Sequence, residues 1–168
     1  MRTGIALGSN IEPRMDHLHE AGKFLDALHE GTEPLRASGI YETAPLDCPV
    51  GSGDFYNTVI EIDSSLAPLD LLKKLQAFEH ELGRPDERPR NSPRPIDLDI
   101  LYMGALQIRE DRLVIPHPAI SSRRFVLEPL AEIRPELQLP GYPSDTKTLL
   151  AALAEEQGFC RRIADFPR

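Results

Sequence analysis

The hydrophobic positions of this chain follow two different periods, and each period predicts one kind of element. Short apolar runs bounded by Gly, Pro, Ser or Asn predict β-strands, whereas apolar residues spaced three or four positions apart predict amphipathic helices. Helical spacing covers residues 14–30 and residues 68–82, the second of which begins at a proline and stops at Gly83. The predicted order is strand 3–7, helix 14–30, strand 35–43, strand 55–62, helix 68–82, strand 96–103 and a short strand 106–108.

The second half of the chain is predicted to add helices to this core. A short helix is expected around Val126, Leu127 and Leu130, and a last helix over about 144–157, capped by Ser144 and ended by Gly158. The order β-α-β-β-α-β with helical additions predicts an α+β fold, a ferredoxin-like antiparallel sheet with helices mainly on one face and C-terminal helical additions. The other face would be free for ligands. We expect one domain over residues 1–168, a length sufficient to bury a full core.

Charge and cysteine content narrow the classes of function. A formal net charge of −8 argues against a nucleic-acid partner. Cys48 and Cys160 form neither a disulfide framework nor a metal-binding spacing, and no segment approaches a membrane-spanning length. We therefore expect a cytoplasmic protein with no membrane or nucleic-acid partner, and we separately expect a monomer. Four arginines and two acidic residues lie between Arg84 and Arg94, and this local net charge of +2 is typical of an anion site.

The most informative stretch is residues 88–101, where an arginine- and proline-rich loop runs into a strand carrying Asp97 and Asp99. Side chains at i and i+2 of a strand point to the same face, so the two carboxylates should project together. At about 4 Å they would repel by roughly 4 kcal/mol at an effective dielectric near 20, and they therefore need a cation or a shared proton. Hard oxygen ligands suit Mg²⁺, which substrate phosphates commonly complete, and arginines bind the same phosphates through paired hydrogen bonds.

A simpler reading of this stretch also stays open. Two aspartates on the solvent face of an edge strand, beside arginines on a solvated loop, would give the same residues. The combination of the loop with the carboxylate strand favours the metal and phosphate site.

Three further features suggest a ligand site. The connections 44–53 and 84–95 are rich in Pro or Gly, and the second suits a mobile lid. His117 lies between two prolines, which would present it rigidly. Asn57 lies in an aromatic strand, where a buried amide either cross-links the structure or reads a ligand edge, and the residue alone favours the structural role.

Seven motifs in order carry a resemblance to a known family: ALGSN at 6–10, YETAPL at 41–46, FYN at 55–57, ELGR at 81–84, PRPIDLDIL at 93–101, IPHP at 115–118 and RRFVLEPL at 123–130. Over roughly residues 3–137 the chain resembles the 6-hydroxymethyl-7,8-dihydropterin pyrophosphokinase family of folate biosynthesis. The resemblance implies a ferredoxin-like fold, two Mg²⁺ ions, and transfer of pyrophosphate from ATP to the pterin hydroxymethyl group with release of AMP.

The resemblance also implies roles for individual residues. Asp97 and Asp99 correspond to the Mg²⁺ ligands, and the contacts to the phosphates and leaving group correspond to Arg84, Arg94, His117 and Arg123. The ATP-binding residues on the nucleoside side correspond to Leu72, Gln76, Glu79, Ile100 and Arg112. The pterin-binding residues correspond to Thr43, Pro45, Leu46, Phe55, Asn57 and Phe125, with two aromatic rings stacking on the pterin and the amide reading its edge.

The chain departs from the best-known members of the family at four positions. Asn91 replaces a tryptophan of the lid, Asp86 an arginine, Phe55 a tyrosine and Pro118 an aromatic residue. Arg88 or Arg90 would substitute for the lid contacts. Two other classes of function stay open at this point: a nucleotidyltransferase, which would attack the α-phosphorus and release pyrophosphate, and a non-catalytic nucleotide-binding module.

Overall fold

The computed structural model describes residues 1–46, 48–83, 92–153 and 158–167. Its first half contains β1 (Arg2–Ser9), α1 (Arg14–Ala27), β2 (Arg36–Ala37), β3 (Ile40–Thr43), β4 (Phe55–Asp63) and α2 (Pro68–Glu81). Its second half contains β5 (Asp97–Met103), β6 (Ile108–Glu110), β7 (Leu113–Ile115), the 3₁₀ turn η1 (Ile120–Ser122), α3 (Arg124–Ile133), α4 (Thr146–Ala152) and β8 (Cys160–Ala164). In the described part of the chain no helix combines the length and apolar character needed to cross a membrane.

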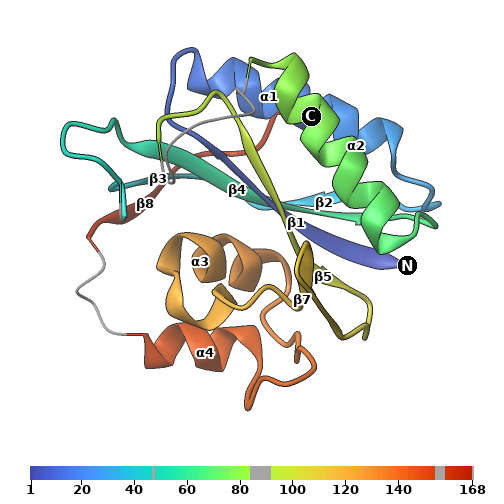
Figure 1. Ribbon diagram of the computed structural model, residues 1–168. Helices are drawn as coiled ribbons and strands as arrows, with labels where there is room; N and C mark the ends of the chain where they lie inside the picture. The colour runs from blue at the N-terminus through green and yellow to red at the C-terminus, as the bar shows by residue number, and fades with distance from the viewer. Residues whose placement is uncertain (47, 84–91, 154–157, 168) are drawn as a thin grey trace.

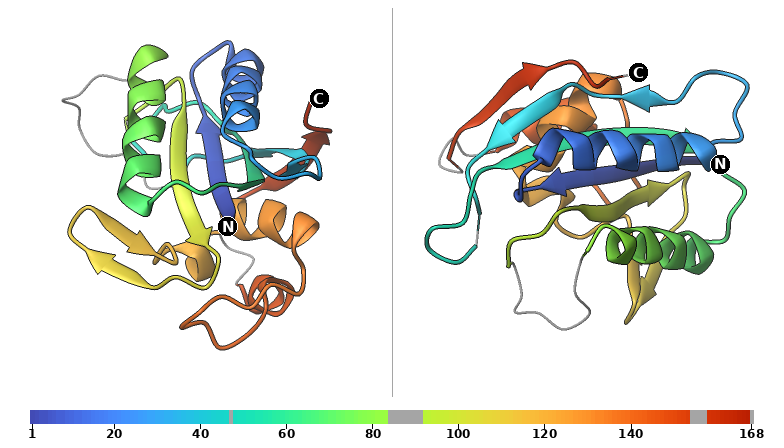
Figure 2. Two further views of the ribbon diagram at one scale, coloured as in Figure 1. Left: turned by 90° about the vertical axis from the view of Figure 1, so that its right-hand side faces the viewer. Right: turned by 90° about the horizontal axis from the view of Figure 1, so that it is seen from above.

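The main sheet is antiparallel throughout and has the strand order β5-β1-β4-β3-β8, with β2 also paired to β4. β1 therefore lies between β4 and β5 (Figure 1). A separate hairpin, β6 and β7, projects beside the sheet (Figure 2). The fold is thus α+β, as the sequence predicted.

One face of the sheet packs against α1 and α2. The large apolar residues of β1, Ile5 and Leu7, are completely or almost completely buried on this face together with Leu18 of α1 and Leu71 of α2. The rings of Phe24 and Phe78 stack between the two helices, with centroids 4.3 Å apart. The helical periods of the sequence predicted this layer correctly.

The opposite face of the sheet is also partly covered, contrary to the expectation that it would be free. Val59 of β4 and Leu101 of β5 are buried against Leu127 and Leu130 of α3, and α4 packs beneath α3 (Figure 1). The apolar stripe of α3 needed a partner surface, and the outer face of the sheet provides it. Among the described residues, one end of this face borders a cleft.

Several predicted boundaries were wrong in detail. The predicted strand 35–43 is two strands, because Ser38 and Gly39 interrupt it, and the predicted strand 106–108 is β6 at residues 108–110. The last helix is shorter than predicted, and its cap is Asp145, whose Oδ1 accepts the Thr148 N–H at 2.8 Å, rather than Ser144. The C-terminal strand β8 was not predicted. Its burial pattern is almost entirely exposed, so it has no apolar alternation to indicate a strand.

Candidate active site

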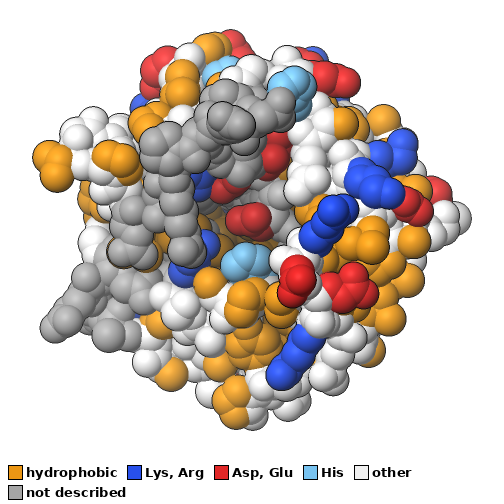
Figure 3. Space-filling view, viewed as in Figure 1, with side chains coloured by type: hydrophobic (Ala, Val, Ile, Leu, Met, Phe, Trp, Pro, Cys, Tyr) orange, Lys and Arg blue, Asp and Glu red, His pale blue; other side chains and the backbone are white. Residues whose placement is uncertain are grey.

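A cleft lies at one end of the outer face, between β1, β4, β5 and the start of α3. The floor of the cleft consists of the small residues Ala6 and Gly8 of β1. In the sheet register Gly8 is the partner of both Asn57 and Asp97, and Ala6 is the partner of Asp99. Acidic, basic and histidine side chains gather near the middle of this side of the molecule (Figure 3). Small side chains on the central strand therefore leave room for a ligand between polar groups on both neighbours.

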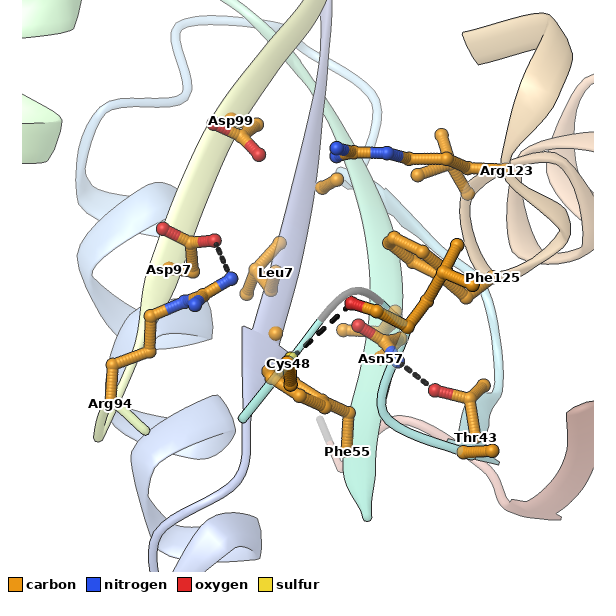
Figure 4. A pocket seen from close by; sticks show the side chains of 16 residues that line it. Leu7, Thr43, Cys48, Phe55, Asn57, Arg94, Asp97, Asp99, Arg123 and Phe125 are labelled. Atoms are coloured by element: carbon orange, nitrogen blue, oxygen red, sulfur yellow. Dashed lines mark hydrogen bonds and ion pairs between the residues drawn. The ribbon is translucent and has the colours of Figure 1, made fainter. Parts of the chain in front are cut away.

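Asp97 and Asp99 both line the cleft, as their spacing on a strand predicted. Figure 4 shows the two carboxylates on one side, with Arg123 reaching toward Asp99 from the start of α3. Among the described residues no group of three or more His, Cys, Asp or Glu side chains could hold a metal ion. Two carboxylates with phosphate oxygens as further ligands are nevertheless the donor set that suits Mg²⁺, which retains several non-protein ligands. The residues present therefore fit a magnesium site completed by phosphate oxygens.

Arg94 is held beside these aspartates by contacts of its backbone and of its guanidinium group. Its Nη2 lies 2.7 Å from Asp97 Oδ2, and its backbone N–H donates to Asn10 Oδ1 at 2.9 Å. The side chain is only 14% exposed. Within the described residues, Arg94 Nε is a buried donor without a hydrogen-bond partner. A phosphate oxygen could accept from such a donor, since a guanidinium presents several N–H groups in a fixed plane.

The opposite wall of the cleft carries the residues assigned to the pterin. Asn57 is 6% exposed and its Nδ2 donates to Thr43 Oγ1 at 2.7 Å, so one amide donor is used internally. The rings of Phe55 and Phe125 line the same cleft, as does Leu46. The cross-link and the ligand-reading role proposed for Asn57 are compatible, because an amide has four hydrogen-bonding sites.

Two arginine–phenylalanine pairs lie in the cleft. The Arg94 guanidinium lies 5.3 Å from the centroid of the Phe55 ring, and that of Arg123 lies 5.6 Å from the centroid of Phe125. Both distances are within the range of cation–π attraction. The positively charged groups that would face phosphates are therefore adjacent to the rings that would stack on an aromatic substrate.

His117 lies outside the residues that line the cleft but is electrostatically linked to them. Burial and the Arg123 charge lower the pKa of His117, and the Asp97 carboxylate only partly opposes them. This lowered pKa favours the neutral ring at pH 7. Its Nδ1 accepts the Ala119 N–H at 3.2 Å, which leaves Nε2 as the protonated nitrogen and a hydrogen-bond donor.

The residues assigned to the nucleoside are not brought into the same cleft. Glu79 is buried, and its Oε1 accepts the Leu98 N–H at 2.6 Å, so it holds α2 against the start of β5. Ile100 is 3% exposed in the core. Leu72 is partly buried, Gln76 is exposed on α2, and Arg112 is exposed in the turn between β6 and β7.

Several of the predicted site residues are not among the residues that the structure describes. Arg84, Asp86, Arg88, Arg90 and Asn91 lie outside the described residues, and with them most of the predicted lid. Pro45 is partly buried at the start of the connection between β3 and β4.

The sequence reasoning missed three contributors to the site. Asn10 was part of a quoted motif without a role, yet its side chain orients the backbone of Arg94. Gly8 has no side chain, and a Cβ atom there would lie 2.9 Å from Asn57 Oδ1. Cys48 lines the cleft, and its Sγ donates to the Leu46 carbonyl at 3.3 Å. Strand pairing and loop geometry show the contacts of Asn10 and Cys48. For Gly8, the small residues at alternate positions of β1 were a signal in the sequence that could have indicated an open space above the strand.

Comparison with known proteins gives consistent results. The family model described as 7,8-dihydro-6-hydroxymethylpterin-pyrophosphokinase (HPPK) matches residues 4–135. The 2-amino-4-hydroxy-6-hydroxymethyldihydropteridine pyrophosphokinase of Bacillus subtilis is 40% identical over 142 residues, which cover 84% of this chain and 83% of that protein. The protein of the same name from Haemophilus influenzae is 42% identical over 136 residues, covering 81% and 83%.

The fold has matches among solved structures as well. A crystal structure of wild-type Plasmodium falciparum HPPK-DHPS with pteroate aligns with a TM-score of 0.68 at 14% identity, over 89% of this chain and 42% of that one. At this identity the likeness concerns the fold alone. The chain spans less than half the length of that two-part protein.

Proposed function

The chain belongs to the 7,8-dihydro-6-hydroxymethylpterin-pyrophosphokinase family, and we propose that the cleft on the outer face of its sheet is the site of the reaction. The enzyme transfers pyrophosphate from ATP to the hydroxymethyl group of 6-hydroxymethyl-7,8-dihydropterin, a step of folate synthesis. We propose the following roles for individual residues in this reaction.

The observation that carries the site proposal is the sharing of one cleft by two chemically different walls. Asp97 and Asp99 line one side, and Asn57 with two phenyl rings lines the other. A pterin bound on one wall and phosphates bound on the other would place the substrate hydroxyl group beside the phosphates. Positioning of this kind is the main requirement of phosphoryl-type transfer. Thr43, Pro45, Leu46, Phe55, Asn57 and Phe125 are the proposed pterin residues.

The triphosphate is proposed to bind along Asp97, Asp99, Arg94 and Arg123, with His117 donating from Nε2. We propose two Mg²⁺ ions held by Asp97 and Asp99. Magnesium, when bound, neutralises phosphate charge and orients the phosphates. Arg84 belongs to the same proposed set by the family resemblance, and it lies outside the described residues.

The chemistry needs no nucleophilic side chain. The substrate hydroxymethyl oxygen forms a bond to the β-phosphorus, the bridging bond from that phosphorus to the α-phosphate oxygen breaks, and the hydroxyl proton leaves to solvent. AMP is the leaving group. Arg94 and Arg123 stabilise the charge that moves onto the phosphate oxygens, because fixed cations in a partly buried site act more strongly than in water.

The nucleoside is proposed to lie beyond the cleft toward Leu72, Gln76, Glu79, Ile100 and Arg112. The buried Glu79 and Ile100 would take part through the backbone they support rather than by an exposed side chain.

The order in which the strands lie side by side in the sheet supports a ferredoxin-like plan for the core. The pairing of β8 with β3 supports a single domain over residues 1–168. We further propose a cytoplasmic monomer, in keeping with the free thiols of Cys48 and Cys160.

The decisive experiment is product analysis. The protein is incubated with ATP, Mg²⁺ and 6-hydroxymethyl-7,8-dihydropterin, and the nucleotides are separated by chromatography. AMP should form only when the pterin is present and in step with a pterin diphosphate. ADP or free pyrophosphate as the product would contradict the proposed attack at the β-phosphorus.

A further inference from the structure

The side chain of Arg14 lies in an unusually complete set of contacts behind the pterin wall. Arg14 is the first residue of α1, and its side chain is 18% exposed. Its Nη1 donates to the Asp54 carbonyl oxygen at 3.0 Å, and its Nε donates to Glu12 Oε1 at 2.7 Å. The guanidinium carbon lies 3.9 Å from the centroid of the Tyr56 ring. A surface arginine that only provided solubility would not be held on three sides.

These contacts lie on the back of the hairpin formed by β3 and β4. Thr43 pairs with Phe55, and these residues and Asn57 point into the cleft. Glu42 pairs with Tyr56 between them, so the side chains of this pair point to the opposite face. Arg14 contacts that pair from behind, since its Nη1 also lies 3.8 Å from Glu42 Oε1.

A second arginine meets the same carboxylate from the other edge of the sheet. Arg161 of β8 lies 2.5 Å from Glu42 Oε2, and the Ala44 N–H donates to the Phe159 carbonyl oxygen at 3.2 Å. Arg161 is 69% exposed, whereas Glu42 and Arg14 are 17% and 18% exposed. Exposed ion pairs contribute little, so Arg161 adds little despite its shorter distance, and Arg14 is the less exposed of the two arginines beside Glu42.

We propose that Arg14 is a positioning residue for the pterin pocket. By holding Asp54, Tyr56 and Glu42 from behind, it fixes the position of Phe55 and Asn57 on the front before the substrate arrives. A pocket that is already ordered binds with a smaller entropic cost. The inference rests on the proposed pterin pocket, and it adds a residue that does not touch the substrate.

Apart from the contact of Arg94 with the Phe55 ring, the phosphate wall has its own supports. Arg94 is held by Asn10 and Asp97, and Asp97 lies on β5 at the far side of β1. Loss of Arg14 should therefore weaken pterin binding and leave nucleotide binding unchanged. This selectivity distinguishes positioning of the pterin pocket from general support of the fold.

The test is calorimetry on Arg14→Met, which keeps the length of the side chain and removes its donors and charge. The pterin is titrated in the presence of saturating α,β-methylene-ATP with Mg²⁺, and the nucleotide analogue is titrated alone. We expect the pterin Kd to rise about tenfold, from the loss of one hydrogen bond and one cation–π contact, with the nucleotide Kd unchanged. Arg14→Lys should recover part of the pterin affinity, and in steady-state assays KM for the pterin should change more than kcat.

Two further variants serve as a control and as an alternative test. Lys23→Met removes an ion pair with Glu20 on the same helix, where both side chains are more than half exposed, and it should change neither Kd. Glu42→Gln removes the shared carboxylate with little change in size, and it should raise the pterin Kd even if Arg14→Met does not fold. An unchanged pterin Kd in folded Arg14→Met, or equal losses for pterin and nucleotide, would overturn the inference.

Phe125→Ala separates this inference from the pocket assignment on which it rests. Weaker pterin binding in Phe125→Ala with normal binding in Arg14→Met would overturn only the role of Arg14. Normal pterin binding in Phe125→Ala would overturn the pocket assignment, and the inference with it.

Discussion

The two ends of the outer face of β4 carry acidic or polar groups in very different surroundings. Phe55 and Asn57 lie at the end that borders the open cleft, and Glu61 lies on the same face at the other end. Glu61 is 5% exposed, and its carboxylate is fully engaged: Tyr102 Oη donates to Oε2 at 2.5 Å and Arg134 Nε donates to the same oxygen at 2.9 Å.

The contrast arises from what covers each end. A Cβ atom at Gly4 would lie 2.2 Å from the Tyr102 ring, so the space above this small residue of β1 is filled by an aromatic side chain. A Cβ atom at Gly8 would meet the Phe55 ring only at 3.7 Å, so among the described residues the same pattern of small residues borders a cleft. An acidic residue therefore stabilises the fold where other side chains bury it and bond to it. Where it borders a cleft, it is a candidate metal ligand.

Neutralising one carboxylate at the open end should have the largest effect. Asp97→Asn or Asp99→Asn should lower turnover by roughly a thousandfold or more while the protein stays folded, because charge compensation between the metal and the phosphates is lost. Steady-state assays with AMP as the readout measure this, and circular dichroism checks the fold. Asp70→Asn, at an exposed site on α2, is the matched control. Near-normal turnover in either cleft variant at ordinary Mg²⁺ would contradict the metal assignment.

At the closed end the same kind of substitution should affect stability. Glu61→Gln leaves the Arg134 guanidinium without its charged partner, and the loss of one member of a buried pair costs about 3–5 kcal/mol of unfolding free energy. Urea unfolding measures this, with Glu20→Gln at an exposed helix position as the control, where less than about 1 kcal/mol is expected. Activity per folded molecule should be retained, and a loss of turnover comparable to that of Asp97→Asn would erase the distinction between the two ends.

The pH dependence of this stability has a defined sign. Burial raises the pKa of Glu61, but hydrogen bonds from Arg134 and Tyr102 outweigh it and hold the pKa below the ordinary value of 4.5. The contribution is therefore complete above pH 4.5 and is lost as the pH falls through the lowered value. The difference in unfolding free energy between the parent protein and Glu61→Gln should shrink below pH 4.5, and a difference that stays constant to pH 3 would contradict this assignment.

Removing one aromatic wall of the open end should have a smaller and more selective effect. Phe125→Ala should raise the pterin Kd by roughly tenfold, the loss of one stacking surface, and leave the nucleotide Kd nearly unchanged. Calorimetry with each ligand decides this. Equal losses for pterin and nucleotide would mean that the two walls do not serve separate ligands.

The smallest change is a single methyl group on the floor of the cleft. In Gly8→Ala the new Cβ atom would lie 2.9 Å from Asn57 Oδ1, so the amide must shift by a few tenths of an ångström. We expect the pterin Kd to rise a few-fold, with the fold intact. Gly53→Ala is the control, since its Cβ would meet its nearest neighbour, the Asn10 carbonyl oxygen, at an ordinary 3.5 Å. Equal behaviour of the two variants would show that Asn57 is not sensitive to this contact.

The sequence itself determined much of this arrangement. The helical spacing of α1 and α2 and the apolar runs of β1, β4 and β5 are local patterns, and all five elements form close to where they were predicted. Alternation along a strand placed Asp97 and Asp99 on one face, because the side-chain period of a strand is fixed by its backbone. The order of motifs in the first 130 residues was sufficient to indicate the family.

Tertiary structure alone decided the rest, for a physical reason common to each case. The strand β8 has no apolar alternation, and it forms because β3 offers it an unpaired edge. The burial of Glu79 and Glu61, the contacts of Asn10 and Arg14, and the covering of part of the outer face by α3 all depend on residues distant in sequence. Local patterns record which side chains a segment carries, whereas the partners that fill, neutralise or leave open the space around them are set only when the sheet and its two helical layers assemble.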